Sequence, residues 1–215
     1  LGDVYKRQGK ILLIKMRHMP RCAHNQRILH STMPPAVQKI YEGGGKAVYH
    51  MKKVALIMGS DSDLPIVTPA VKQLKELGIE TEVRVMSAHR TPKQAQDFAE
   101  NAAKNGFGVI IAAAGMAAHL GGVLAASTTL PVIGIPCSAK VLDGMDAMLA
   151  TVMMPPGIPV ATVGVNAAKN AALLAAEILA VGDDALAKKL ADMRKDMENA
   201  VIEKDKAMQE KIKEI

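Results

Sequence analysis

Short apolar segments alternate with longer segments of helical periodicity from residue 53 to residue 179. Segments with the composition of strands lie at 53–58, 80–86, 109–113, 132–135 and 159–165. Segments expected to be helical lie at 64–77, 92–105, 143–152 and 166–179. Strands that alternate with helices in this way predict an α/β fold, a three-layer αβα doubly wound parallel sheet with right-handed crossovers.

Charge divides the chain at about residue 50. Of the 27 Lys and Arg and the 21 Asp and Glu, nine and two fall in residues 1–50, which leaves 18 and 19 in residues 51–215. A basic arm for nucleic acid or a transit peptide would have such a composition. The interpretation we favour is a non-native or disordered extension translated from upstream sequence, because Met51 directly precedes a lysine pair and the first apolar segment. No nucleic-acid partner is then expected.

Residues 51–215 are long enough for a single catalytic domain with a sizeable core. Cys22 and Cys137 make a poor disulfide pair, which favours a reducing, cytoplasmic compartment. Residues 108–126 carry no charged side chain and are long enough to imitate a membrane span. Four glycines and His119 in that stretch favour a buried strand, a turn and a close-packed helix instead, so no membrane partner is expected.

Apolar residues recur at helical spacing from about residue 183 to residue 215. They are Leu186, Leu190, Met193, Met197, Val201, Met208, Ile212 and Ile215. This pattern predicts a long C-terminal amphipathic helix, longer than a domain of this size needs. The helix either lies on its own domain or, as we prefer, packs against a neighbouring subunit.

Three polar or glycine-bearing loops follow consecutive expected strands. They are residues 59–63 (GSDSD), 87–92 (SAHRTP) and 115–119 (GMAAH). Because parallel strands end at the same edge of a sheet, these loops are expected to converge where open α/β sheets bind phosphorylated ligands. The sequence has no cluster with metal-ligand spacing, so no metal is expected, and it has neither a Walker nor a GxGxxG loop.

Several side chains in these loops suit a phosphate ester. Ser60 and Ser62 offer hydroxyls beside the free N–H groups of the next helix. Asp63 could accept hydrogen bonds from ribose hydroxyls, or simply cap that helix. Arg90 can engage two phosphate oxygens with its planar guanidinium, although a surface ion pair is the ordinary role of such a residue.

The loops also carry two histidines. His89 belongs to the residue type that exchanges protons in both directions near neutral pH, although a lone loop histidine is usually solvated and idle. Its place between Ser87 and Arg90, aimed at the same edge as the other loops, favours catalysis. His119 is expected to cap or pad its own helix.

Six ordered sequence blocks resemble the class I N5-carboxyaminoimidazole ribonucleotide mutases of de novo purine biosynthesis. The blocks are VALIMGSDSD (54–63), SAHRTP (87–92), VIIAAAG with AAHL (109–115, 117–120), LPVIGIP (130–136), MPPGIPVATV (154–163) and NAALLAAEIL (170–179). Related class II enzymes use free carbon dioxide and typically carry Lys in place of Arg90, without the AAHL block. Arg90 and His119 therefore favour class I, and with it a flavodoxin-like fold.

The resemblance implies conversion of N5-carboxyaminoimidazole ribonucleotide to 4-carboxy-5-aminoimidazole ribonucleotide by a cytoplasmic homo-octamer without a cofactor. His89 would protonate the nitrogen that loses carbon dioxide, and then remove the proton from the ring carbon that recaptures it. The residues expected to bind the substrate are Ser60, Ser62, Asp63, Ser87, Ala88, Arg90, Gly115, Ala118, His119 and Leu120.

Three positions depart from the family pattern. The usual AGGAAHLPG has methionine at 116 and glycine at 121 in this chain, and Met153 replaces a glutamine. Met116 places bulk in a loop where close approach of the backbone is expected. A sister group that acts on a pyridinium nucleotide can also carry Gly-Met here, although SAHRTP and NAALLA argue against it. A nucleotide-sensing domain without turnover remains the non-enzyme alternative.

Overall fold

The computed structural model describes residues 40–42, 46–48, 52–140 and 142–215, and it divides into two units between Tyr49 and His50. In the first unit, β1 (Ile40–Glu42) pairs antiparallel with β2 (Lys46–Val48). The sequence predicts no strand here, because three-residue strands are too short to show a period. The other residues of the extension expected at 1–50 lie outside the described residues.

The second unit contains a five-stranded sheet in which all neighbouring strands run parallel. Its strands are β3 (Lys53–Met58), β4 (Thr81–Val85), β5 (Phe107–Gly115), β6 (Val132–Cys137) and β7 (Ala161–Thr162). They lie in the order β4-β3-β5-β6-β7, so the direction of winding reverses between β3 and β5. This is the flavodoxin-like order, and such sheets bind ligands at the carboxyl ends of the strands beside the reversal.

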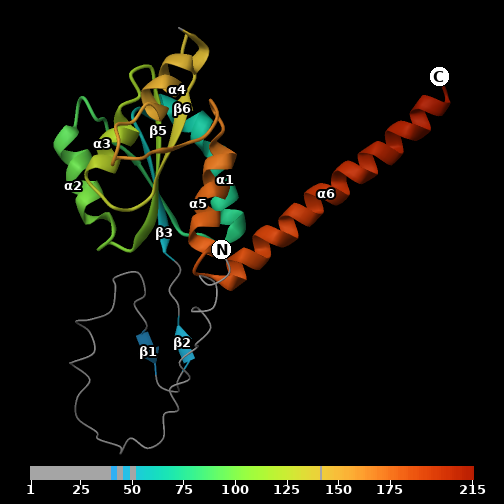
Figure 1. Cartoon of the computed structure of the whole chain (residues 1–215), viewed down its shortest axis with the longest axis horizontal. Helices are drawn as coiled ribbons and strands as arrows, with labels where there is room; N and C mark the ends of the chain where they lie inside the picture. Colours follow the sequence, from blue (N-terminus) through green and yellow to red (C-terminus); the bar gives the residue numbers. More distant parts are fainter. Residues whose placement is uncertain (1–39, 43–45, 49–51, 141) are drawn as a thin grey trace, which may run out of the picture. The chain divides into compact units, whose positions relative to one another are not determined.

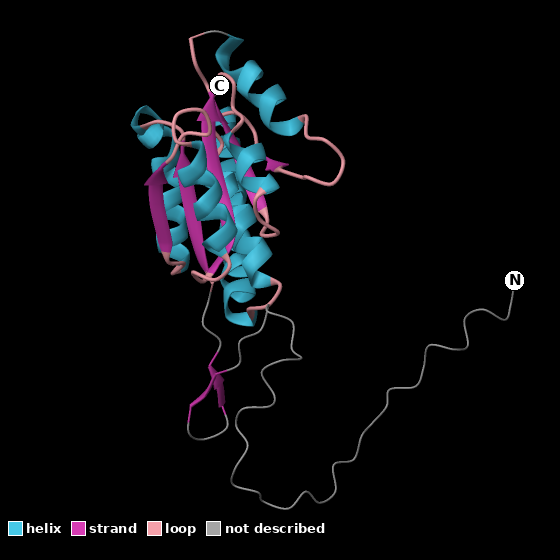
Figure 2. Cartoon of the chain, turned by 90° about the vertical axis from the view of Figure 1, so that its left-hand side faces the viewer, coloured by secondary structure: helices cyan, strands magenta, loops and turns pink. Residues whose placement is uncertain are grey.

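Helices cover both faces of the sheet and give the three layers that the sequence predicts (Figure 2). The helices of the first face are α1 (Leu64–Leu77) and α5 (Ala168–Ala180). Those of the second face are α2 (Pro92–Ala102), α3 (Leu120–Ala126) and α4 (Met145–Val152). The charge-free stretch 108–126 is thus β5, a turn and α3, as expected, and among the described residues no helix is long and apolar enough to cross a membrane.

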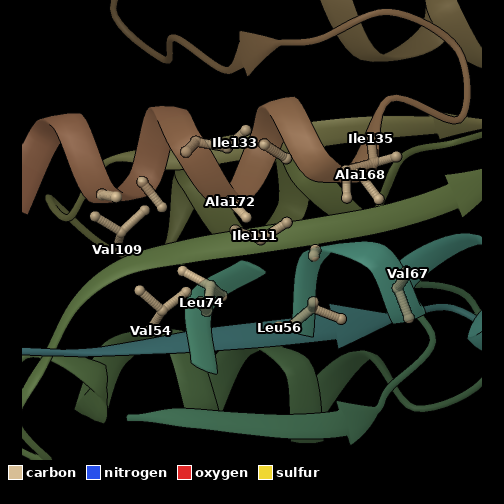
Figure 3. Close-up of a cluster of buried hydrophobic side chains, with 14 of the residues drawn as sticks. Val54, Leu56, Val67, Leu74, Val109, Ile111, Ile133, Ile135, Ala168 and Ala172 are labelled. Carbon is tan, nitrogen blue, oxygen red and sulfur yellow. The ribbon is translucent and has the colours of Figure 1, made fainter. Parts of the chain in front are cut away.

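The alternation of side chains along the strands produces a separate core on each face. Figure 3 shows the first, in which Leu56 of β3 and Ile111 of β5 pack with Leu74 of α1 and Ala172 of α5, all completely buried. The buried face of α5 consists of alanines, which lets this helix lie close to the sheet. Burial of apolar surface stabilises such a core by about 25 cal/mol per Å².

Gly134 of β6 provides a test of this packing. A Cβ atom there would overlap Cγ2 of Thr151 in α4 and lie 3.2 Å from Cγ1 of Val160. We expect Gly134→Ala to lower the free energy of unfolding by about 1–3 kcal/mol, because one methyl group overpacks a filled space. Gly182→Ala is the matched control, since nothing lies within 4 Å of its Cβ position. Urea unfolding followed by circular dichroism measures both, and equal midpoints would contradict the packing described.

One expected local contact is wrong. Asp63 stands immediately before α1, but its side chain makes no capping hydrogen bond. Asp61, Ser62 and Asp63 form a 3-10 turn that leads directly into the helix, so the backbone of Asp63 is already helical. Ser60 caps this turn instead, because its Oγ accepts a hydrogen bond from the N–H of Ser62 at 3.3 Å.

The predicted C-terminal helix is present as α6 (Asp184–Lys213). The carboxylate of Asp183 caps its first turn by accepting from the N–H of Leu186 at 3.0 Å. Lys189 Nζ donates to the carbonyl of Leu77 at 2.9 Å and ties α6 to the end of α1. Only Leu186 and Leu190 of this helix are buried, and beyond them α6 extends away from the sheet (Figure 1).

Candidate active site

The three polar loops meet at the carboxyl edge of the sheet, as the strand pattern predicts. The loop after β4 contacts both of the others. Its Arg90 donates from a guanidinium nitrogen to the carbonyl oxygen of Gly59 at 3.1 Å, and its His89 lies 2.9 Å from His119, measured from Nε2 to Nδ1. Because β3 and β5 flank the reversal of strand order, the two partner loops stand on either side of it.

The first loop holds a compact group of polar side chains. The hydroxyl of Ser62 donates to Ser60 Oγ at 2.8 Å, and Ser60 Oγ lies 3.2 Å from a carboxylate oxygen of Asp61. Both hydroxyls therefore share one small region at the end of β3. The expected role of Ser60 and Ser62 in binding phosphate stays a prediction.

Burial raises the pKa of Asp63 above its ordinary value, and the neighbouring charge of Asp61 raises it further, whereas the backbone hydrogen bond at Ser60 lowers it. Cys137, at the end of β6, is buried, and this burial together with the charge of Asp63 raises the pKa of its thiol to about 12. The thiol therefore remains protonated at neutral pH, which makes it a poor nucleophile.

The second loop is closed by its own side chains. Ser87 N–H donates to Thr91 Oγ1 at 2.9 Å, and the backbone N–H of Arg90 donates to Ser87 Oγ at 3.1 Å. Thr91 Oγ1 also donates to the carbonyl of Ser87 at 3.2 Å. Thr91 was not predicted as a site residue, although a threonine directly before a helix-opening proline is a recognisable turn signal. These bonds hold His89 and Arg90 on a fixed turn.

A pocket of about 330 Å³ opens between the first two loops. It is lined by Gly59, Ser60, Asp61, Val85, Met86, Ser87, Arg90 and Thr91. Ser60, Ser87 and Arg90 were expected at the site, whereas Asp61, Val85, Met86 and Thr91 were not. The cavity thus presents hydroxyls, the guanidinium of Arg90 and the carboxylate of Asp61, and of these the hydroxyls and the guanidinium suit a phosphate ester.

The role expected for His119 as a helix cap is wrong. It stands at the position before α3, but its side chain makes no capping hydrogen bond and faces His89 instead. The two rings are nearly perpendicular, at 79°, with centroids 5.0 Å apart. Since only one proton fits between the facing nitrogens, the pair can hold a proton and pass it on.

Apart from His119 and Met116, the third loop contributes little side-chain surface. Ala118 and Leu120, both expected to bind substrate, have side chains that are only 2% exposed, and Leu120 belongs to the second core. Any contact with a ligand is therefore left to the backbone around Ala118. Gly115 ends β5. A Cβ atom there would lie 3.2 Å from the carbonyl oxygen of Cys137, so a residue without a side chain suits this position.

Within the described part of the chain, no three His, Cys, Asp or Glu side chains are grouped as a metal ion would require. The second unit thus combines two features. It has a flavodoxin-like sheet, and the carboxyl edge of that sheet carries a histidine pair, an arginine and clustered serine hydroxyls. These features define an α/β protein whose candidate site has a chemistry suited to a phosphorylated small molecule.

Comparison with known proteins identifies the family. Residues 53–200 match the AIR carboxylase family, and the chain belongs to it. The chain is 54% identical over 147 residues to the N5-carboxyaminoimidazole ribonucleotide mutase of Pyrococcus abyssi, covering 68% of this chain and 84% of that one. It is 52% identical over 160 residues to the same enzyme of Methanocaldococcus jannaschii, covering 74% and 99%.

A solved structure agrees with this assignment. The crystal structure of Treponema denticola PurE matches with a TM-score of 0.64 at 29% identity, over 71% of this chain and 95% of that one. The match supports the flavodoxin-like fold and the family expected from the sequence blocks.

Proposed function

We propose that this chain is the mutase that converts N5-carboxyaminoimidazole ribonucleotide into 4-carboxy-5-aminoimidazole ribonucleotide in purine biosynthesis. The observation that carries the proposal is the convergence of His89, His119 and Arg90 at the edge of the sheet, in a chain about half identical to enzymes of that name. The mutase is an isomerase, so the carboxyl group leaves one atom of the substrate and joins another.

The nucleotide is bound through its phosphate and ribose. Arg90 and the hydroxyl of Ser60 hold the phosphate, since both line the pocket and the guanidinium can engage two oxygens. Asp63 accepts from the ribose hydroxyls, and the raised pKa of its half-buried carboxyl reflects how costly its charge is until such donors are present. Ser62, Ser87 and the backbone around Ala88, Gly115 and Ala118 line the space for the base.

His89 acts as general acid and then as general base. As the bond between the substituent nitrogen and the carboxyl carbon breaks, its electron pair stays on nitrogen, protonated His89 supplies a proton there, and neutral carbon dioxide is released. The ring carbon then attacks carbon dioxide, and neutral His89 removes the proton from that carbon. One group serves both steps because the reaction has no net proton change.

His119 is a positioning residue in this scheme. Its Nδ1 lies within hydrogen-bond distance of His89 Nε2, so it fixes the orientation of the His89 ring and the proton that the two share. Carbon dioxide needs no activation beyond being held next to the ring carbon, because the aminoimidazole is an electron-rich nucleophile and proximity supplies much of the rate.

The experiment uses the full chain with N5-carboxyaminoimidazole ribonucleotide and follows the 4-carboxy product by chromatography. We expect catalytic turnover without added metal or cofactor. Saturable binding of the nucleotide without turnover would contradict the mutase and favour the sensing domain. Turnover restricted to a pyridinium nucleotide would move the chain to the sister group.

We also propose that the catalytic domain, residues 51–215, assembles as a cytoplasmic homo-octamer in which α6 packs on a neighbouring copy. Met197, Val201, Met208 and Ile212 are each more than half exposed, although they continue the apolar face that begins at the buried Leu190. A second copy would cover this face.

Sedimentation measures the assembly directly. We expect Val201→Glu with Met208→Glu to convert the full chain to a smaller species, because two charges cannot be buried unpaired in an apolar contact. Lys195→Glu, away from this apolar face on the same helix, is the matched control and should leave the mass unchanged. An unaltered mass for the double variant would contradict the role of α6.

A further inference from the structure

Met116 holds a backbone conformation that methionine rarely adopts. Its φ is 53°, in the left-handed region, and among the described residues only Leu142, Asp143 and Asn166 share a positive φ without being glycine. A glycine would make the same turn with less strain, because it has no Cβ. Strain of this kind persists where the surroundings enforce it, and it clusters at functional sites.

The turn itself positions His119. The carbonyl of Met116 accepts from the N–H of Ala118 at 2.9 Å, and the carbonyl of Ala117 accepts from the N–H of His119 at 2.8 Å. These two tight turns lead from the end of β5 to the histidine that faces His89. The backbone conformation therefore has a use, but that use requires no side chain at residue 116.

The side chain of Met116 is 64% exposed, whereas those of Ala118 and Leu120 beside it are buried. Leu64 and Val85, next to the other two site loops, are also about half exposed, at 50% and 49%. Each of the three loops thus adjoins one large apolar side chain in contact with solvent. We call these three residues, Leu64, Val85 and Met116, the apolar rim.

We propose that the side chain of Met116, with the rest of the apolar rim, closes over the ribonucleotide bound by the mutase and delays the escape of carbon dioxide. The inference rests on the proposed function, in which neutral carbon dioxide is free between two steps. Apolar side chains over the site exclude the water through which carbon dioxide would leave. A flexible thioether can close over ligands of irregular shape. Methionine thus has a use at this position, although glycine would be less strained there.

The test measures how the intermediate divides between two fates. Full-length wild type, Met116→Gly, Met116→Ala and Met116→Leu are given N5-carboxyaminoimidazole ribonucleotide in ¹³C-bicarbonate, with the uncatalysed loss subtracted. We expect Gly and Ala to raise the fraction released as aminoimidazole ribonucleotide roughly tenfold, with ¹³C entering the product, as loss of an apolar contact of this size allows. For Met116→Leu we expect a released fraction within about twofold of wild type, because leucine keeps a large apolar side chain at this position.

This ratio does not depend on how much enzyme is folded, so a loss of folded enzyme alone would leave it unchanged. Leu142→Gly is the matched control, since Leu142 has φ 57° and is 67% exposed. We expect it to keep the wild-type ratio. Wild-type partition in Met116→Gly and Met116→Ala, or equal release by Leu142→Gly, would overturn this inference alone. A wild type that makes no 4-carboxy product would overturn the proposed function and this inference with it.

Discussion

Replacement of His89 by glutamine is expected to lower kcat by about 10³–10⁴-fold, while the nucleotide still binds. Glutamine can keep a hydrogen bond to His119, but it cannot take up and return a proton. Both proposed steps need that proton, so both barriers rise together. Steady-state rates with N5-carboxyaminoimidazole ribonucleotide, and equilibrium dialysis with aminoimidazole ribonucleotide, measure the two quantities separately.

His119→Gln is the informative comparison for His89→Gln. It leaves His89 in place and removes only the group that orients it. We therefore expect a loss of about tenfold, below the 10²–10⁴-fold that a proton-transfer group itself contributes. Turnover of His89→Gln within tenfold of wild type would remove His89 as the shuttle and leave the site as a binding pocket.

Replacement of Arg90 by alanine should act on binding instead. The guanidinium bridges the first two loops through the carbonyl of Gly59 and lines the pocket proposed for the phosphate. We expect kcat/KM to fall about 100-fold, mostly through KM, because a charge-assisted contact with phosphate persists in the ground state and the transition state alike. Initial rates over a wide range of substrate concentration separate the two constants.

Arg90→Lys is the matched variant, since it keeps the charge but loses the planar fork that engages two oxygens. An intermediate rise in KM is expected for it. A fall in kcat with an unchanged KM for Arg90→Ala would show instead that the arginine takes part in the chemical step, and the phosphate would then have to be held by other groups.

The sequence is most informative where local chemistry alone decides the structure. The strand at 53–58 and the helix at 64–77 have the predicted bounds, because glycines follow both and Gly78 ends α1 in the left-handed conformation, with φ 79°. The convergence of the loops also follows, since it requires only that the strands be parallel. The order of the strands has no such local signal and comes from the structure.

Other features depend on conformations that residue type does not reveal. The strand expected at 159–165 is only Ala161–Thr162, because only these two residues pair with β6. The helix expected from residue 143 begins at Met145, after left-handed Asp143 and Gly144.

At the site, the contact between His89 and His119 spans thirty residues of sequence and is set by two tight turns. No periodicity or spacing could predict it. The roles assigned to Ser60, Arg90 and His89 rest on residue type, and the structure adds which of these side chains lie near one another.

The most direct test of the central claim compares two substrates for the full chain. One is N5-carboxyaminoimidazole ribonucleotide, and the other is aminoimidazole ribonucleotide with bicarbonate. The account predicts rapid conversion of the first, and reaction of the second only at high bicarbonate, because the carboxyl group passes within the site. Equal or greater activity with the second pair would show a carboxylase that takes up free carbon dioxide, and would contradict the proposed transfer.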